Sequence, residues 1–186
     1  MGRIWRPQRL LTIAIAAIAS LLVLTLPVTA RGASCNGLST WSRFSSGPQV
    51  NQAHVFCGEF SNNRPKGFHS RPGGRNPNTV ANLQITQNPN SQGIYGIRWS
   101  HTSNPQRTKF STMFPDSCST GQVLNSVRYA AGNRSQCPAS APSWSWCGPS
   151  APASGGDYCR GNNGDRFTVA GAFTRRNDIN TAFPLR

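Results

Sequence analysis

Five short segments between residues 80 and 183 have the sequence character of β-strands, and the first two alternate apolar and polar residues as half-buried strands do. The clearest is 93–100, GIYGIRWS, in which Ile97 and Trp99 fall on one side and predict a buried face. Two further segments are separated only by residues 175–177 and predict a hairpin. The predicted strands are 80–86, 93–100, 109–114, 166–174 and 178–183.

One segment, 120–131, has its apolar residues at helical spacing, with Val123, Val127 and Ala131 four residues apart. Ser119 is typical of an N-cap, and Gly132 predicts the end of the helix. A shorter helix is expected over 49–56. A few helices packed on antiparallel strands predict an α+β fold.

Two stretches are rich in turn residues. Residues 61–90 are crowded with Asn, Pro, Gly and Arg, so we expect mostly loop there apart from the strand 80–86. Residues 137–164 are dense in Pro, Ser and Gly, and strand-like sequence resumes beyond them, which indicates a Cys-rich insert. We expect Trp144 and Trp146 to fill the core of this insert rather than to stack on nucleic-acid bases.

The N-terminus has the layout of a secretory signal peptide over residues 1–30. Three arginines precede an apolar run from residue 10 to residue 26, and small residues follow Pro27. The alternative is an uncleaved membrane anchor. Cleavage would leave an N-terminal arm, 31–48, and one domain, 49–186, secreted or otherwise outside the cytoplasm and without a stable membrane partner.

All six cysteines lie beyond the predicted signal peptide, which in an exported chain indicates disulfides. Cys57 is therefore expected in a disulfide and not as a nucleophile. No CxxC pair exists, so a zinc site is not predicted. Cleavage would leave 16 of the 19 basic residues and all five acidic ones, a net charge of 16 − 5 = +11. This surplus favours a polyanionic partner, either nucleic acid or an anionic envelope.

Two of the three histidines, His54 and His69, lie 15 residues apart in a segment that also carries glycines and basic residues. Imidazoles titrate near neutral pH and suit general acid–base cleavage of a phosphodiester. Lys109 is one of only two lysines. His101 follows a predicted strand, and we expect no catalytic role for it.

Four segments that include these residues together resemble the endonuclease U family in its bacterial form. That family also includes the animal poly(U)-preferring endoribonucleases and the nidoviral uridylate-specific endonuclease. The resemblance covers about residues 49–186, but the insert 137–164 is not part of the family core. The matching segments are HVFCGEF at 54–60, KGFH at 66–69, KFSTMFPDSCSTGQVLNSVRYA at 109–130 and INTAFP at 179–184.

The resemblance implies cleavage of single-stranded RNA on the 3′ side of uridines, leaving a 2′,3′-cyclic phosphate, at a ribonuclease-like site in a cleft. His69 would be the general base, His54 the general acid, and Lys109 the cation that stabilises the developing negative charge. No cofactor is required, although Mn²⁺ is needed by some relatives. A cognate immunity or inhibitor protein is a candidate partner if the enzyme is a toxin.

Five further residues are candidates for substrate binding. Gly67, or Phe68 beside it, would bind a phosphate oxygen through its backbone N–H, since glycine permits close approach. Thr181 would lie near the uracil edge, and Phe183 would stack on the ribose or base. Ser111 and Thr112 are weaker candidates for base contacts.

Each role has a structural alternative. Phe183 is as well explained as a core residue, Thr181 as a strand residue, and Lys109 alone as a surface cation. For Glu59 we expect a salt bridge with an arginine, the alternative being that it orients a histidine.

At the level of the whole protein, the alternatives to a nuclease are a non-catalytic basic module that binds RNA or the envelope, and a structural exported protein without a site.

Overall fold

The structure is a computed structural model that describes residues 1–2 and 34–186. The predicted signal peptide therefore lies, apart from its first two residues, outside the described part. Within that part the chain forms two α-helices, one 3-10 helix and eight strands. In chain order these are α1 (Gln52–Phe56), β1 (Glu59–Ser61), β2 (Arg64–Lys66), η1 (Pro72–Gly74), β3 (Val80–Gln87), β4 (Tyr95–His101), β5 (Asn104–Met113), α2 (Thr120–Gly132), β6 (Trp146–Pro149), β7 (Thr168–Phe173) and β8 (Ile179–Pro184).

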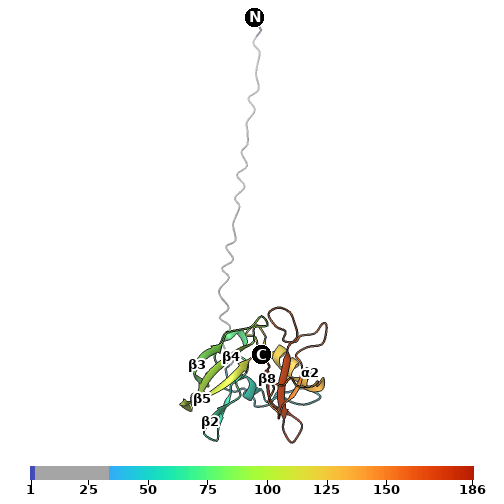
Figure 1. Ribbon diagram of the computed structural model, residues 1–186. Coiled ribbons are helices and arrows are strands. Elements are labelled where there is room, and N and C mark those ends of the chain that lie inside the picture. The colour runs from blue at the N-terminus through green and yellow to red at the C-terminus, as the bar shows by residue number, and fades with distance from the viewer. Residues whose placement is uncertain (3–33) are drawn as a thin grey trace.

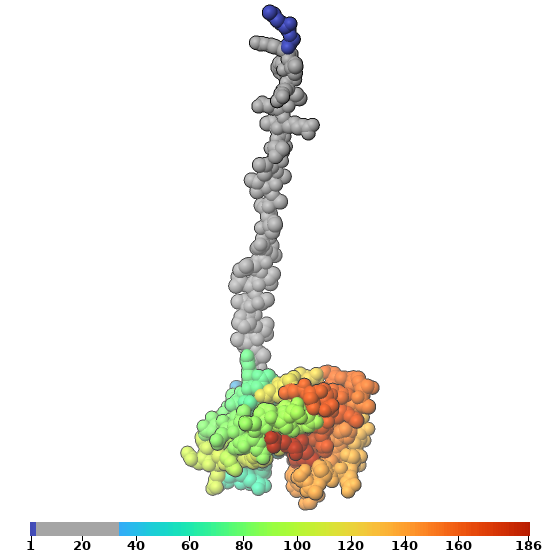
Figure 2. All heavy atoms as spheres, turned by 45° about the horizontal axis from the view of Figure 1, so that its top comes forward, coloured from blue at the N-terminus to red at the C-terminus, as the bar shows by residue number. Residues whose placement is uncertain are grey.

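The strands form three antiparallel sheets, ordered β1-β2, β3-β4-β5 and β6-β7-β8. This arrangement confirms the predicted α+β class. Figure 1 shows the sheet β3-β4-β5 beside β8, with α2 against the sheet that contains β8. In the space-filling view the dark red C-terminal residues lie between the green residues of the sheet β3-β4-β5 and the orange residues of the later part of the chain (Figure 2).

Strand β4, in the middle of the sheet β3-β4-β5, carries a buried face as its alternation predicts. Ile97 and Trp99 are both fully buried, and the Trp99 ring packs edge-on against Phe68 at 5.2 Å between centroids. Phe68 comes from the loop after β2, so this small core attaches that loop to the sheet.

Helix α2 packs on the other main sheet and forms the larger core. Ser119 is the N-cap and forms a reciprocal capping box with Gln122. Val123, Val127 and Ala131 are buried as predicted. Gly132 is the last residue of the helix rather than the residue after it.

The six cysteines form three disulfides, as predicted, and Cys57 is in one of them. The pairs are Cys35–Cys57, Cys118–Cys159 and Cys137–Cys147. Disulfides persist in oxidising compartments, which is consistent with an extracytoplasmic protein. In residues 34–186, no helix is long and apolar enough to cross a membrane.

Three elements differ from the expectations. Strands β1 and β2 form a hairpin where loop was expected, because Asn62 and Asn63 adopt positive φ values of 52° and 55° and close a tight two-residue turn. Strand β5 begins five residues before the predicted start at residue 109. Its first half is largely exposed on both faces, so its sequence has no apolar alternation that predicts a strand. In the Cys-rich segment 137–164, Trp146–Pro149 is not loop but strand β6.

The contact between α2 and β6 gives a test of this packing. A Cβ added at Gly148 would lie 2.2 Å from the carbonyl oxygen of Ala130, so Gly148→Ala must push the helix from the strand. We expect a loss of about 1–3 kcal/mol in the free energy of unfolding. Gly132→Ala is the matched control, because nothing lies within 4 Å of its added Cβ. Urea unfolding of the oxidised variants measures both, and equal midpoints would contradict the packing.

Candidate active site

All eight residues predicted for the site line one pocket of about 700 Å³. Its walls come from α1, from β2 and the loop after it, from β5, from β8 and from the segment 140–144. The predicted residues that share it are His54, Gly67, His69, Lys109, Ser111, Thr112, Thr181 and Phe183. The structure thus makes them neighbours, and the role of each remains a proposal.

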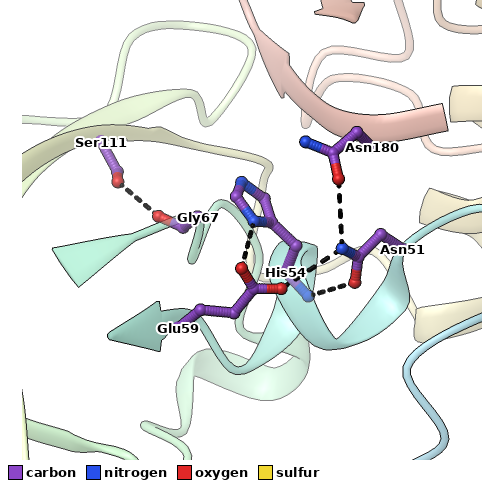
Figure 3. Close-up of polar contacts among 6 residues, drawn as sticks. All are labelled: Asn51, His54, Glu59, Gly67, Ser111 and Asn180. Carbon is purple, nitrogen blue, oxygen red and sulfur yellow. Dashed lines mark hydrogen bonds and ion pairs between the residues drawn. The ribbon is translucent and has the colours of Figure 1, made fainter. Parts of the chain in front are cut away.

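His54 is buried in the short helix α1 and is contacted at its backbone N–H and at its ring. The Asn51 side chain caps the helix by accepting a hydrogen bond from the His54 N–H at 3.0 Å. Asn51 also donates to Glu59 Oε1 at 3.2 Å and to Asn180 Oδ1 at 3.4 Å. Figure 3 shows this chain of contacts from β8 through Asn51 to Glu59.

Glu59 contacts the His54 ring and not an arginine, so the expectation of an arginine salt bridge was wrong. The Glu59 Oε2 atom lies 3.2 Å from His54 Nδ1. The hydrogen-bonding and charge of His54 lower the pKa of Glu59, which keeps this carboxylate ionised.

The loop that carries His69 is fixed to the carbonyls of α1. The Phe68 N–H donates to the His54 carbonyl and the His69 N–H to the Val55 carbonyl, both at 2.7 Å. Gly67 has a φ of +70°, and a Cβ there would lie 2.1 Å from the His54 carbonyl oxygen. Only glycine fits this approach. Because the Phe68 N–H is engaged, Gly67 is the remaining candidate for a phosphate contact.

The His69 ring is held in one orientation and kept neutral. Its Nδ1 lies 3.0 Å from the Thr112 carbonyl oxygen, which can only accept a hydrogen bond. Nδ1 therefore carries the proton, and Nε2 is left with a free lone pair. Burial, followed by the charge of Lys109, holds the pKa of His69 well below its usual value. A neutral imidazole with a free Nε2 can accept a proton at pH 7.

Lys109 reaches the same pocket from β5. Its Nζ donates to Ser111 Oγ at 2.7 Å and to the Phe110 carbonyl at 3.0 Å. Burial lowers the pKa of Lys109 to about 8.

The Ser111 hydroxyl is buried and already has three partners. It accepts from Lys109 and from Trp99 Nε1, and it donates to the Gly67 carbonyl at 3.0 Å (Figure 3). These contacts support a role in positioning Lys109 better than direct contact with a base. Thr112 contributes its carbonyl oxygen to His69, a role that its side chain could not indicate.

Two aromatic rings form one wall of the pocket. Phe183 is half-buried rather than in the core, and its ring lies 5.3 Å from that of His69 and 5.9 Å from that of Trp144. Trp144 is 60% exposed, so the expectation that it fills the core of an insert was wrong. The reason is a turn, closed by the Ser145 N–H to the Pro142 carbonyl, that places residue 144 at its outer corner. Trp146, at the start of β6, does pack against the core.

The pocket is lined by cations and by no carboxylate. Besides Lys109, three basic residues that the sequence analysis did not single out lie there: Arg64, Lys66 and Arg186. With bases spread along the whole sequence, nothing marked these three. Asn51 could have been found, since an asparagine three residues before His54 is a standard N-cap position.

His101 lies outside the pocket, where its Nδ1 accepts from the Ser103 N–H. In the described residues, no three His, Cys, Asp or Glu side chains are grouped so that they could hold a metal ion.

Two histidines of different environment lie beside a half-buried lysine in a basic pocket of a disulfide-linked α+β fold. This arrangement suits an acid–base enzyme for a polyanionic substrate. Residues 48–186 match the family model of the bacterial EndoU nucleases. The chain belongs to this family, which confirms the predicted resemblance and identifies the protein as a nuclease that acts on nucleic acid. Comparison with curated proteins gave no match, and neither did comparison with solved structures.

The electrostatic coupling of Lys109 to His69 can be measured directly. We expect Lys109→Met to raise the pKa of His69, because removing a neighbouring cation makes the imidazolium less unfavourable. An NMR titration of the imidazole Cε1–H signals reports this pKa. Lys66→Met is the matched control, since Lys66 lines the pocket but does not act on His69. An equal shift in both variants, or none in either, would contradict the coupling.

Proposed function

We propose that this protein is an extracytoplasmic endoribonuclease that cleaves single-stranded RNA after uridines and leaves 2′,3′-cyclic phosphate ends. One observation carries the proposal: the rings of His54 and His69 lie 6.4 Å apart across one pocket in opposite electrostatic settings. A carboxylate faces His54, whereas a cation and burial keep His69 neutral. This difference supports His69 as the base and His54 as the acid.

In the proposed reaction His69 Nε2 removes the proton of the ribose 2′-hydroxyl. The 2′-oxygen then forms a bond to phosphorus, and the bond from phosphorus to the 5′-oxygen breaks. His54 donates its proton to that leaving oxygen, so the products are a cyclic phosphate and a 5′-hydroxyl. The two histidines exchange protonation states, and proton transfers restore them before the next turnover.

Lys109 would stabilise the charge that builds on the phosphoryl oxygens, since a preorganised cation acts most strongly where charge develops. Its bonds to Ser111 and the Phe110 carbonyl fix the ammonium in place before substrate arrives. No step needs a metal ion, because these side chains supply the base, the acid and the cation. We therefore propose catalysis without a required cofactor.

Recognition of uridine would rest on the β8 side of the pocket. Thr181 lines this side of the pocket, where its hydroxyl would meet the edge of a base, and the half-buried Phe183 ring would offer a face for stacking. Base–aromatic stacking contributes roughly 1–3 kcal/mol per base. Phe183 should accordingly affect binding more than bond cleavage.

A non-catalytic module that binds RNA or the envelope would need the positive charge but not the opposed histidines. The observed asymmetry around the two rings therefore favours the enzyme over the binding module.

The central test is His69→Ala. We expect a loss of about 10²–10⁴-fold in the cleavage rate, the usual contribution of a positioned acid–base group. The assay is digestion of an oligonucleotide with one uridine, with mass analysis of the ends, in which the wild-type protein should give a cyclic phosphate. His101→Ala is the control and should cleave normally. Undiminished cleavage by the His69 variant would refute the mechanism.

The pKa of Lys109 predicts how the cleavage rate changes at alkaline pH. The cationic form is the useful one, so its contribution is present below the pKa and is lost as the pH rises through about 8. We expect the cleavage rate to fall above this pH. Lys109→Arg keeps its charge at higher pH and should move the fall upward, even if the maximal rate is lower. A wild-type rate that stays level or rises from about pH 7.5 to 9.5 would rule out a required Lys109 cation.

A further inference from the structure

We propose that the loop 137–147, closed by the Cys137–Cys147 disulfide, is a second nucleotide-binding element of this enzyme. The exposed Trp144 ring would stack on the base of a nucleotide next to the one held at the two histidines. The inference rests on the proposed function, and it extends the RNA-binding site from one nucleotide to at least two.

Exposure and position distinguish Trp144. It is the most exposed aromatic residue of the described chain, at 60%, whereas Trp99 is fully buried. A bare indole face in water is unfavourable, and it becomes favourable when another flat ring covers it. A lone exposed apolar residue needs no explanation, but this one lines the pocket that holds the catalytic candidates.

The rings at this wall form a continuous series. His69 lies next to Phe183, and Phe183 lies next to Trp144, which meets it at an interplanar angle of 62°. A base that stacks on Phe183 would belong to the nucleotide held at the two histidines. The exposed face of Trp144 is one ring further from the reacting phosphate, where a neighbouring base would lie.

The loop holds Trp144 in place before RNA binds. The Pro142 carbonyl accepts from both the N–H and the hydroxyl of Ser145, at 2.9 and 2.7 Å. The Ser135 N–H donates to the Cys147 carbonyl at 2.9 Å, so the loop is tied to β6 next to the disulfide. A ring that is already fixed loses little conformational entropy on binding.

The charges around the loop suit the phosphates that would accompany a second nucleotide. Arg64, Lys66 and Arg186 line the pocket together with Trp144, and no acidic side chain does. Nucleic-acid strands are commonly bound by such a combination of cations for the backbone and aromatic rings for the bases. Because every base has a flat face, Trp144 should bind any base rather than select one.

The experiment compares Trp144→Ala with the wild-type protein on a uridine-containing tetranucleotide. For the tetranucleotide we expect KM to rise about 5- to 150-fold, the equivalent of roughly 1–3 kcal/mol of stacking. The kcat should stay within about twofold, because Trp144 does not touch the reacting atoms. Trp144→Phe should restore most of the affinity. Ile85→Ala is the control, since Ile85 is also exposed but lies outside the pocket.

A second measurement separates this proposal from the function it rests on. Fluorescence polarisation of a labelled tetranucleotide with 2′-deoxyribose, which has no attacking hydroxyl, gives the Kd without cleavage. We expect the Trp144→Ala variant to bind it more weakly by the same factor. If the wild-type protein cleaves no RNA but this factor appears, the proposed function fails and the loop retains its role. Unchanged KM and Kd in the variant, or a loss confined to kcat, would overturn the role of Trp144.

Discussion

The site depends on the pairing of the loop 67–69 with the carbonyl ends of α1. Two backbone hydrogen bonds, from the N–H groups of Phe68 and His69, directly join the segment that carries His69 to the helix that carries His54. The close approach requires Gly67 in a left-handed conformation, and it leaves Phe68 with a positive φ of 56°. Such a conformation is unfavourable for a bulky residue and persists because burial of the Phe68 ring against Trp99 offsets it. The distance between the histidines is thus set by backbone geometry and not by their own side chains.

Every other part of the site is attached to this pairing. The Gly67 carbonyl accepts from Ser111, and Ser111 in turn holds Lys109, so the lysine is positioned relative to the loop through one hydroxyl. On the opposite side, Asn51 connects α1 to Glu59 and to Asn180 of β8. The strand with Thr181 and Phe183 is thereby placed against the same helix. A displacement of the loop would therefore disturb His69, His54 and Lys109 together.

The parts that the sequence predicts well are those in which a periodic pattern coincides with burial. The stripe of α2 and the Ile97–Trp99 face of β4 were both found where expected, and the eight residues predicted for the site lie in one pocket. The first half of β5 was missed because its side chains face solvent, and the hairpin β1-β2 because its turn residues resemble loop. The proton on His69 Nδ1 depends on the Thr112 carbonyl, 43 residues away, which no local pattern could have indicated. The contact between Glu59 and His54 and the exposure of Trp144 are local, but they depend on the hairpin β1-β2 and on the turn at 142–145, neither of which was predicted.

The asymmetry of the two histidines also explains why the pocket can tolerate so much positive charge. Lys109 lowers the pKa of His69, which a general base at neutral pH requires, so the cation that would stabilise the phosphoryl oxygens also keeps the base ready. The one carboxylate in contact with His54, that of Glu59, lies 3.2 Å from its Nδ1 and outside the pocket lining. The pocket lining therefore carries basic side chains and no Asp or Glu, which suits attraction of a polyanionic substrate. The position of Glu59 thus combines two features that conflict in a small site, a carboxylate in contact with one imidazole and a pocket lining that attracts a polyanion.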